Sequence, residues 1–269
     1  MVKRKIFRRA ATALLAGAFL FTFPVADADS SAGEILEQGN KLYHAGDFHG
    51  AINFYNELIA LNPNDAVAYN NRGFSYNELG QYARAIQDLD KAIELNPNYD
   101  SAYYSRGFAY SKLGQYAQAI PDLDKAIELN PNYLVAYSER GFSYNELGQY
   151  ARAIQDLDKA IELDPTYVPA YNNRGFSYNE LEQYARAIQD FDKAIELDPN
   201  FTSAYNNRGF AYSKLGQYAR AIQDFDKAIE LNPNFDVAYN ERGFCYQQLG
   251  DAAKAQADFD KAKALGYNG

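Results

Sequence analysis

Residues 69–97 read YNNRGFSYNELGQYARAIQDLDKAIELNP, and this stretch decides the fold. Small and aromatic residues recur at spacings of three and four over 67–79, and small and aliphatic residues do so again over 82–95. Each pattern is typical of a helix with one buried face. Gly80 can adopt the left-handed conformation that ends a helix, and Pro97 cannot continue one. The stretch therefore predicts two helices joined by a tight turn.

The same pattern returns every 34 residues along the chain. Six prolines mark the period: Pro63, Pro97, Pro131, Pro165, Pro199 and Pro233. Residues 75–95 and 143–163 are identical. A 34-residue period is typical of stacked helix-turn-helix units. Seven units follow: 32–65, 66–99, 100–133, 134–167, 168–201, 202–235 and 236–269.

The repeated unit resembles the tetratricopeptide repeat family. The positions that carry the resemblance are Tyr69, Gly73, Tyr76, Ala85, Leu89, Ala92 and Pro97. It implies an all-α, right-handed superhelical solenoid of seven helix-turn-helix repeats, with the first helices lining a concave groove. It also implies a non-enzymatic binding scaffold, a role in which family members take varied partners.

The first 28 residues have the order of a cleavable signal peptide. Five basic residues lie within residues 3–9, an uncharged apolar run spans 10–23, and Ala26-Asp27-Ala28 follows as a cleavage site. The apolar run is shorter than a spanning helix needs, although an uncleaved membrane anchor stays open as an alternative. The segment predicts an exported bacterial protein that is periplasmic or secreted.

Composition argues against several classes of function. The formal net charge is −9, which disfavours nucleic acid as a partner. His44 and His49 fall in the first unit and Cys245 in the last, so no catalytic, metal or cofactor site is expected. No small-molecule cofactor is expected either.

Two sets of repeated residues are expected to hold the array together. Tyrosines at the positions of Tyr69, Tyr76 and Tyr82 predict an aromatic core, with a ligand cage as the alternative. An arginine column consists of Arg72, Arg106, Arg140, Arg174, Arg208 and Arg242. Because the same units carry paired aspartates such as Asp88 and Asp90, we expect arginine–aspartate pairs between helices, with ligand binding as the alternative.

A polypeptide-binding face is expected on the first helices. The candidate residues are Asn70, Asn71, Phe74, Asn77, Phe108, Phe142, Asn172, Asn173, Phe176, Asn206, Asn207, Phe210 and Asn240. An asparagine side chain both donates and accepts hydrogen bonds, so one or two per repeat could form a ladder along an extended peptide backbone. The phenylalanines would add apolar contact. Alternatively, the asparagines are tolerated surface residues copied by duplication.

The two ends of the array look like caps. In the last unit Gln256 and Lys263 replace isoleucines on the outer side of the final helix, whereas Ala255, Phe259 and Ala262 keep the inner side. In the first unit Ile35, Leu36, Gln38 and Asn40 replace the later pattern, which suits an N-terminal cap.

Two positions depart from the repeat. Glu182 replaces the turn glycine, at a cost of about 1–2 kcal/mol if the backbone there is left-handed. Pro121 lies inside a second helix, where it predicts a kink, with simple drift as the alternative.

These features predict a scaffold of the cell envelope that binds an extended segment of a partner protein. The alternative is a self-associating structural protein or assembly factor, a homo-oligomer with contacts through its faces or ends. Membrane contact is expected only through an uncleaved signal segment.

Overall fold

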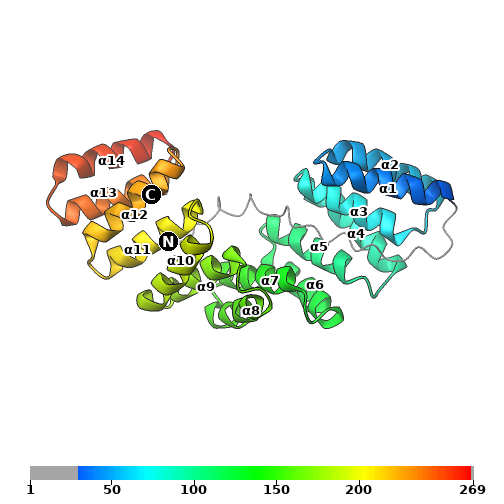
Figure 1. The fold of residues 1–269 in the computed structure, drawn as a ribbon, viewed down its shortest axis with the longest axis horizontal. Coiled ribbons are helices and arrows are strands. Elements are labelled where there is room, and N and C mark those ends of the chain that lie inside the picture. The colour runs from blue at the N-terminus through cyan, green and yellow to red at the C-terminus, as the bar shows by residue number, and fades with distance from the viewer. Residues whose placement is uncertain (1–29, 268–269) are drawn as a thin grey trace. The chain divides into compact units, whose positions relative to one another are not determined.

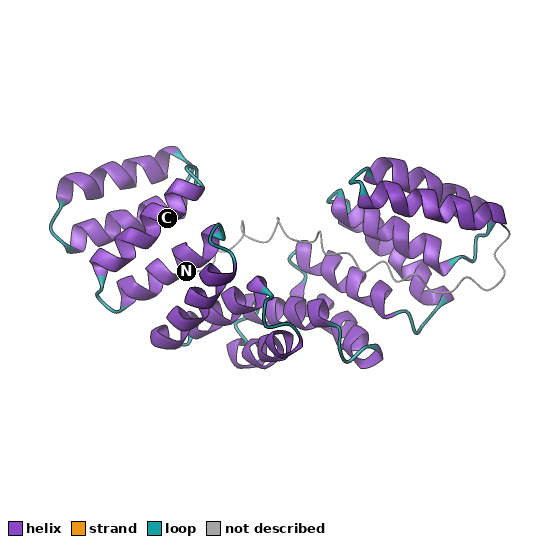
Figure 2. Cartoon of the chain, viewed as in Figure 1, coloured by secondary structure: helices purple, strands orange, loops and turns teal. Residues whose placement is uncertain are grey.

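The computed structural model describes residues 30–267, so the predicted signal segment 1–28 lies outside it. The described residues form fourteen helices and no strand (Figures 1 and 2). They divide into two compact units, residues 30–148 and residues 149–267. The prediction of an all-α array of seven helix-turn-helix repeats is confirmed.

The unit 30–148 contains α1 (Ser30–His44), α2 (Phe48–Leu61), α3 (Ala66–Glu78), α4 (Tyr82–Leu95), α5 (Asp100–Lys112), α6 (Tyr116–Leu129) and α7 (Leu134–Glu146). The unit 149–267 contains α8 (Tyr150–Leu163), α9 (Val168–Glu180), α10 (Tyr184–Leu197), α11 (Thr202–Lys214), α12 (Tyr218–Leu231), α13 (Asp236–Gln248) and α14 (Ala252–Ala264).

Packing follows the repeat within each unit. The two helices of a repeat contact each other, and each second helix contacts the first helix of the next repeat. First helices of successive repeats also contact each other; α3 contacts α5, for example, and α9 contacts α11. Second helices of successive repeats within each described unit do not contact each other. The first helices therefore lie closer together than the second helices in each unit. We call the surface that they form the first-helix face.

The turn between the two helices of a repeat uses a left-handed residue. Gly80 has φ +69°, its N–H donates to the Asn77 carbonyl, and the next N–H, of Gln81, donates to the Tyr76 carbonyl. These bonds satisfy carbonyls that the helix end would otherwise leave open. Glu182 occupies the same place with φ +59°. The backbone at Glu182 is therefore left-handed, which is the condition under which a glutamate there costs about 1–2 kcal/mol.

Helix α6 runs from Tyr116 to Leu129 with Pro121 inside it. Pro121 is exposed, while the next two residues, Asp122 and Leu123, are buried as their equivalents are in other repeats. The proline therefore leaves the packed side of the helix in place. The predicted kink stays a prediction.

The core is built from small residues that let the helices approach closely. Ala85, Leu89 and Ala92 of α4 are fully buried, and tyrosines at the three predicted positions pack against them. A Cβ atom on Gly73 would lie 2.8 Å from Leu89 Cγ, so this glycine sets the distance between α3 and α4. The predicted packing role of the tyrosines is confirmed.

The last helix has the predicted cap character, and the N-terminal cap stays a prediction. On α14 the inner residues Ala255 and Ala262 are buried, whereas Gln256 and Lys263 are exposed. Gln256 donates to Asp260 (Nε2–Oδ1 2.9 Å). At the other end, Ile35 and Leu36 of α1 pack against the core of the first repeat.

Candidate functional site

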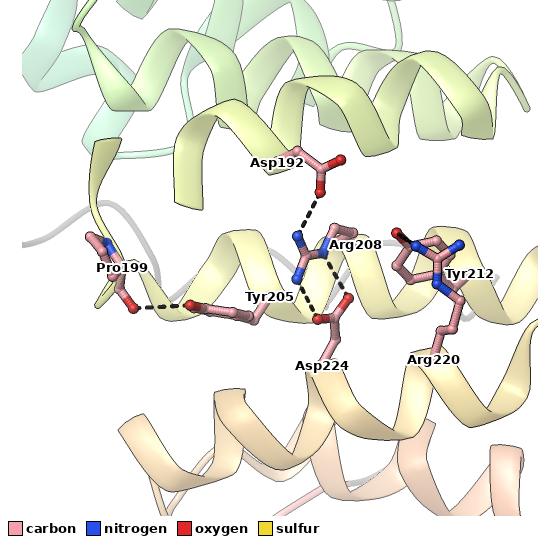
Figure 3. A network of polar contacts seen from close by, with 7 residues as sticks. All are labelled: Asp192, Pro199, Tyr205, Arg208, Tyr212, Arg220 and Asp224. Carbon is pink, nitrogen blue, oxygen red and sulfur yellow. Dashed lines mark hydrogen bonds and ion pairs between the residues drawn. The ribbon is translucent and has the colours of Figure 1, made fainter. Parts of the chain in front are cut away.

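Arginine–aspartate clusters connect three helices at a time. Arg208 of α11 donates from Nε and Nη2 to both carboxylate oxygens of Asp224 on α12, at 2.9 and 2.6 Å. Its Nη1 donates to Asp192 of the preceding α10, at 2.5 Å (Figure 3). Arginine's planar fork suits this two-sided contact. Each such arginine therefore joins its own repeat to the repeat before it.

The arrangement recurs along the arginine column. Arg106, Arg174 and Arg242 make the same three hydrogen bonds, and Arg140 donates to Asp124 at 2.5 Å. At the first junction Arg72 pairs with Asp88, and Asn56 replaces the second carboxylate at 2.6 Å. The predicted arginine–aspartate pairing between helices is confirmed, and it also spans neighbouring repeats.

Burial shapes the electrostatics of these clusters. Burial raises the pKa of Asp190 and Asp224, although Arg174 and Arg208 oppose the rise. Hydrogen bonds to Asp258 raise the pKa of Arg242, and burial opposes that rise. An arginine whose donors already face two carboxylates has little left for a ligand. This geometry favours a structural role for the column.

Tyrosine rings pack against several of the arginine side chains. The Arg208 guanidinium carbon lies 5.6 Å from the centre of the Tyr205 ring, and the Tyr205 hydroxyl donates to the Pro199 carbonyl at 3.2 Å (Figure 3). Arg220, on α12, lies 4.0 Å from the centre of the Tyr212 ring and donates to its hydroxyl at 2.6 Å. Such cation–π contacts add to the ion pairs at modest energy.

Most of the predicted asparagines lie inside the packed first helices. The buried ones are Asn70, Asn71, Asn77, Asn172, Asn206 and Asn207. Asn173 and Asn240 are half-buried. Asn145 and Asn179, which occupy the position of Asn77 in two later repeats, are also buried.

The amide groups of these asparagines hydrogen-bond between repeats. Asn71 Nδ2 donates to Asn40 at 3.1 Å, and Asn207 Nδ2 donates to Asn172 at 3.1 Å. Asn77 Nδ2 reaches a backbone carbonyl of the next first helix at 3.0 Å. The structure therefore places these side chains in contacts that stack one repeat on the next.

Four buried asparagine oxygens within the described residues have no hydrogen-bond partner. They are Oδ1 of Asn70, Asn77, Asn179 and Asn206. Asn70 and Asn77 lie seven residues apart on α3, so the two share one side of the helix. All four oxygens are shielded from solvent, so a peptide would reach them only after neighbouring side chains moved.

The predicted phenylalanines keep more of their surface open. Phe74, Phe108, Phe142, Phe176 and Phe210 are half-buried, and the equivalent Phe244 is 39% exposed. Tyrosines at the start of the preceding second helix contact two of the rings edge-on, as Tyr116 does Phe142 at 6.0 Å. Among the predicted site residues, the phenylalanines offer the open apolar surface.

Sequence reasoning missed two lysines beside these rings. Lys112 Nζ lies 4.7 Å from the centre of the Phe108 ring, and Lys214 Nζ lies 4.9 Å from that of Phe210. The signal was present in the repeat, because Ser-Lys replaces Asn-Glu at the end of two first helices.

Residues 30–267 offer little support for metal binding, membrane spanning or a reactive thiol. Within this range no group of three or more His, Cys, Asp or Glu side chains is placed to hold a metal ion. None of the helices there is long and apolar enough to cross a membrane. Cys245 is fully buried, and burial raises the pKa of its thiol to about 11.

Comparison with known proteins identifies the repeat. Family models described as "Tetratricopeptide repeat" match residues 101–133, 168–201 and 202–235 in one case and 54–87, 123–155 and 225–257 in another. A model described as "TPR repeat" matches 73–114 and 143–181. Together the matches run without a gap from residue 54 to residue 257.

One curated relative is tetratricopeptide repeat protein 28 of Homo sapiens, 43% identical over 49 residues. That match covers 18% of this chain and 2% of the relative, so this chain spans a very small part of it.

Solved structures match over longer ranges. A tetratricopeptide repeat protein from Parabacteroides merdae is 24% identical with a TM-score of 0.69, covering 89% of this chain and 95% of that one. This likeness shows the fold. YrrB, described as a TPR protein with an unusual peptide-binding site, is 26% identical with a TM-score of 0.56, covering 68% of this chain and 95% of its own.

Proposed function

Since the chain belongs to the tetratricopeptide repeat family, we propose that it is a non-enzymatic scaffold that binds an extended segment of a partner protein along the first-helix face. Domains of this family bind proteins and are typically non-catalytic. The identity of the segment and its place on the surface are parts of this proposal.

The phenylalanine column carries the proposal. One half-open ring stands at the same position of six successive repeats, from Phe74 to Phe244. Neighbouring packed helices lie about 8–10 Å apart. A chain in the extended polyproline II conformation rises about 3.1 Å per residue and has three residues per turn, so every third side chain lies on the same side. A bound segment would therefore meet a phenylalanine with about every third residue, and apolar side chains at that spacing would bind best.

The asparagines take a different part in the proposal from the phenylalanines. Their amide nitrogens hold neighbouring repeats together, so they position the first-helix face. Asn173 and Asn240 are half-buried, so they are the predicted asparagines whose surface a peptide backbone could contact, and the Asn240 amide also donates to the Tyr267 hydroxyl at 3.2 Å. The peptide-binding description of YrrB, at 26% identity, supports a peptide as the ligand class.

Export and an envelope partner also belong to the proposal, and they rest on the sequence of residues 1–28. The partner is then a protein of the bacterial cell envelope. N-terminal sequencing of protein recovered from the host's envelope fraction tests this, with Asp29 as the expected first residue. A chain that begins at Met1 or Val2 in the cytosolic fraction would contradict it.

Affinity capture tests the binding face. The baits are the wild-type chain, a variant with Phe74, Phe108 and Phe142 of the unit 30–148 changed to Ala, and a matched control. The control changes Asn53, Gln87 and Gln118, exposed residues of second helices of the same unit, to Ala. Helix content by circular dichroism must agree among the three baits. A partner lost only by the phenylalanine variant supports the proposal, and a partner that this variant retains contradicts it.

A further inference from the structure

The repeats of this chain are similar enough to be confused with one another. Residues 75–95 and 143–163, which include α4 and α8, are identical. Each of these second helices therefore offers the same surface to any first helix that follows it. Misassembly and swapping of repeats are characteristic failures of such arrays. A device that restricts the order must lie where the repeats differ, and the first helices differ at more positions than the second helices α4 to α12 do.

Three positions of the first helices vary together. Two of them are the last two residues of a first helix, and the third is the sixth residue of the next repeat. Three first helices end in Asn-Glu: Asn77-Glu78 precedes Ser105, Asn145-Glu146 precedes Asn173, and Asn179-Glu180 precedes Asn207. Two first helices end in Ser-Lys: Ser111-Lys112 precedes Glu139, and Ser213-Lys214 precedes Glu241. Asn-Glu thus always precedes an uncharged residue, and Ser-Lys always precedes a glutamate. We call the two kinds amide junctions and carboxylate junctions.

In an amide junction the asparagine reaches across to the neighbouring backbone. Asn77 Nδ2 donates to the carbonyl of Ser105 at 3.0 Å, and Asn179 Nδ2 donates to the carbonyl of Asn207 at 3.1 Å. Both donors are buried, and both bonds join first helices of successive repeats. The same geometry therefore occurs once in each of the two compact units.

In a carboxylate junction the shorter serine meets a side chain instead. Ser111 Oγ donates to Glu139 Oε1 at 2.5 Å. At the second such junction burial raises the pKa of Glu241, and the nearby Lys214 opposes this rise. At this second junction the charge of Lys214 thus offsets that of the glutamate that follows.

Mixed junctions would leave groups unsatisfied. A glutamate placed after Asn-Glu would add a carboxylate at the contact with no lysine to offset its charge. An asparagine in place of Glu139 would remove the carboxylate that accepts from the Ser111 hydroxyl. Buried polar groups without partners are costly, so both mixtures disfavour stacking.

We propose that these three positions form a neighbour code that restricts which repeat stacks on which. The code disfavours a glutamate-bearing repeat after Asn-Glu and an uncharged one after Ser-Lys, and it does so equally for repeats of one chain and for repeats of two copies. This role is independent of the partner segment, because it concerns contacts between repeats alone.

A cycle of variants in the full chain tests the code at the junction of Ser111-Lys112 with Glu139. The first variant is Glu139→Asn, the second is Ser111→Asn with Lys112→Glu, and the third carries all three changes, which creates an amide junction. Urea midpoints are measured by circular dichroism. We expect each partial variant to lower the midpoint, and we expect the complete variant to recover most of the summed loss.

The reverse cycle at an independent junction is the control. Asn179→Ser with Glu180→Lys, Asn207→Glu, and the three together convert an amide junction into a carboxylate junction. Coupling of the same sign is expected at both places. Losses that simply add in the complete variants, or partial variants with unchanged midpoints, would overturn the code. If a partial variant fails to fold, a complete variant that is soluble and monomeric still supports the code, and one that also fails refutes it.

Discussion

Replacing Arg208 by leucine removes the cation that joins three helices. Arg208 of α11 makes two hydrogen bonds to Asp224 of α12 and one to Asp192 of α10. The side chain of Asp224 is only 8% exposed, whereas that of Asp192 is 51% exposed. The two carboxylates therefore respond very differently to the loss of their common partner.

The magnitude follows from this difference in exposure. Removing one member of a buried ion pair costs about 3–5 kcal/mol, because the other charge stays buried alone. Since the arginine is itself 18% exposed, we expect about 3 kcal/mol for Arg208→Leu. Changing Asp192 to Asn should cost less than about 1 kcal/mol, as for a surface pair. Changing Arg208 and Asp224 together to leucine should recover most of the loss, because no unpaired charge remains.

The dependence on pH separates charge from packing. Burial already raises the pKa of Asp224, and Arg208 opposes this. Without Arg208 the pKa of Asp224 in the native state rises further above its value in the unfolded state. Protonation of Asp224 therefore stabilises the native state of the variant relative to its unfolded state. The loss caused by Arg208→Leu should therefore be greatest near neutral pH and should shrink as the pH falls toward about 4.

Urea unfolding followed by circular dichroism and tyrosine fluorescence measures these effects, since the chain has no tryptophan. Hydrogen exchange of amides in α11 and α12 localises the loss, because a repeat array need not unfold in one step. The reasoning is refuted if Arg208→Leu is as stable as the wild type. It is also refuted if the loss is the same at pH 4 and pH 7.

Three further variants and one thiol-reactivity measurement test other parts of the structure. Glu182→Gly should stabilise by about 0.5–1 kcal/mol, because relief of the left-handed strain exceeds the added chain entropy; an unchanged urea midpoint would contradict this. Pro121→Gln should stabilise by about 2 kcal/mol, because it restores a backbone donor inside α6, and a loss of stability would show the proline to be accommodated. Gly175→Ala should destabilise by about 1–3 kcal/mol, because the new Cβ would lie 2.6 Å from Phe191 Cε1; a neutral effect would mean that the ring moves freely. Native Cys245 should react with a thiol reagent at pH 8 at least about 100-fold more slowly than the unfolded chain, because its thiol is buried and neutral; equal reaction rates would contradict this. The contribution of Cys245 to stability should fall as the pH rises from about 9 to 11, because only the thiol of the unfolded chain ionises in that range.

The asparagines show where inference from the sequence stopped. Their recurrence at fixed positions of the first helices was visible in the sequence, and it suggested a row of exposed amides. The structure places Asn71 and Asn207 between repeats, where their donors meet other asparagines. A helical pattern states which residues share a side of one helix, but it does not state how closely the next first helix approaches that side. The depth of the contact between two repeats decides whether an amide there faces solvent or protein.

The arginine column shows the same division in its simplest form. Sequence alone determined the 34-residue period, the two helices of each repeat and the left-handed turn between them, because these depend on residues close together in the chain. It also predicted that the arginines pair with aspartates of another helix, without choosing between the two aspartates of each repeat. Only the tertiary structure decided that Arg208 also reaches back to Asp192 and that the phenylalanines keep the open apolar surface. Those contacts depend on the register in which one repeat stacks on the next, and that register is set by side chains packing across the junction.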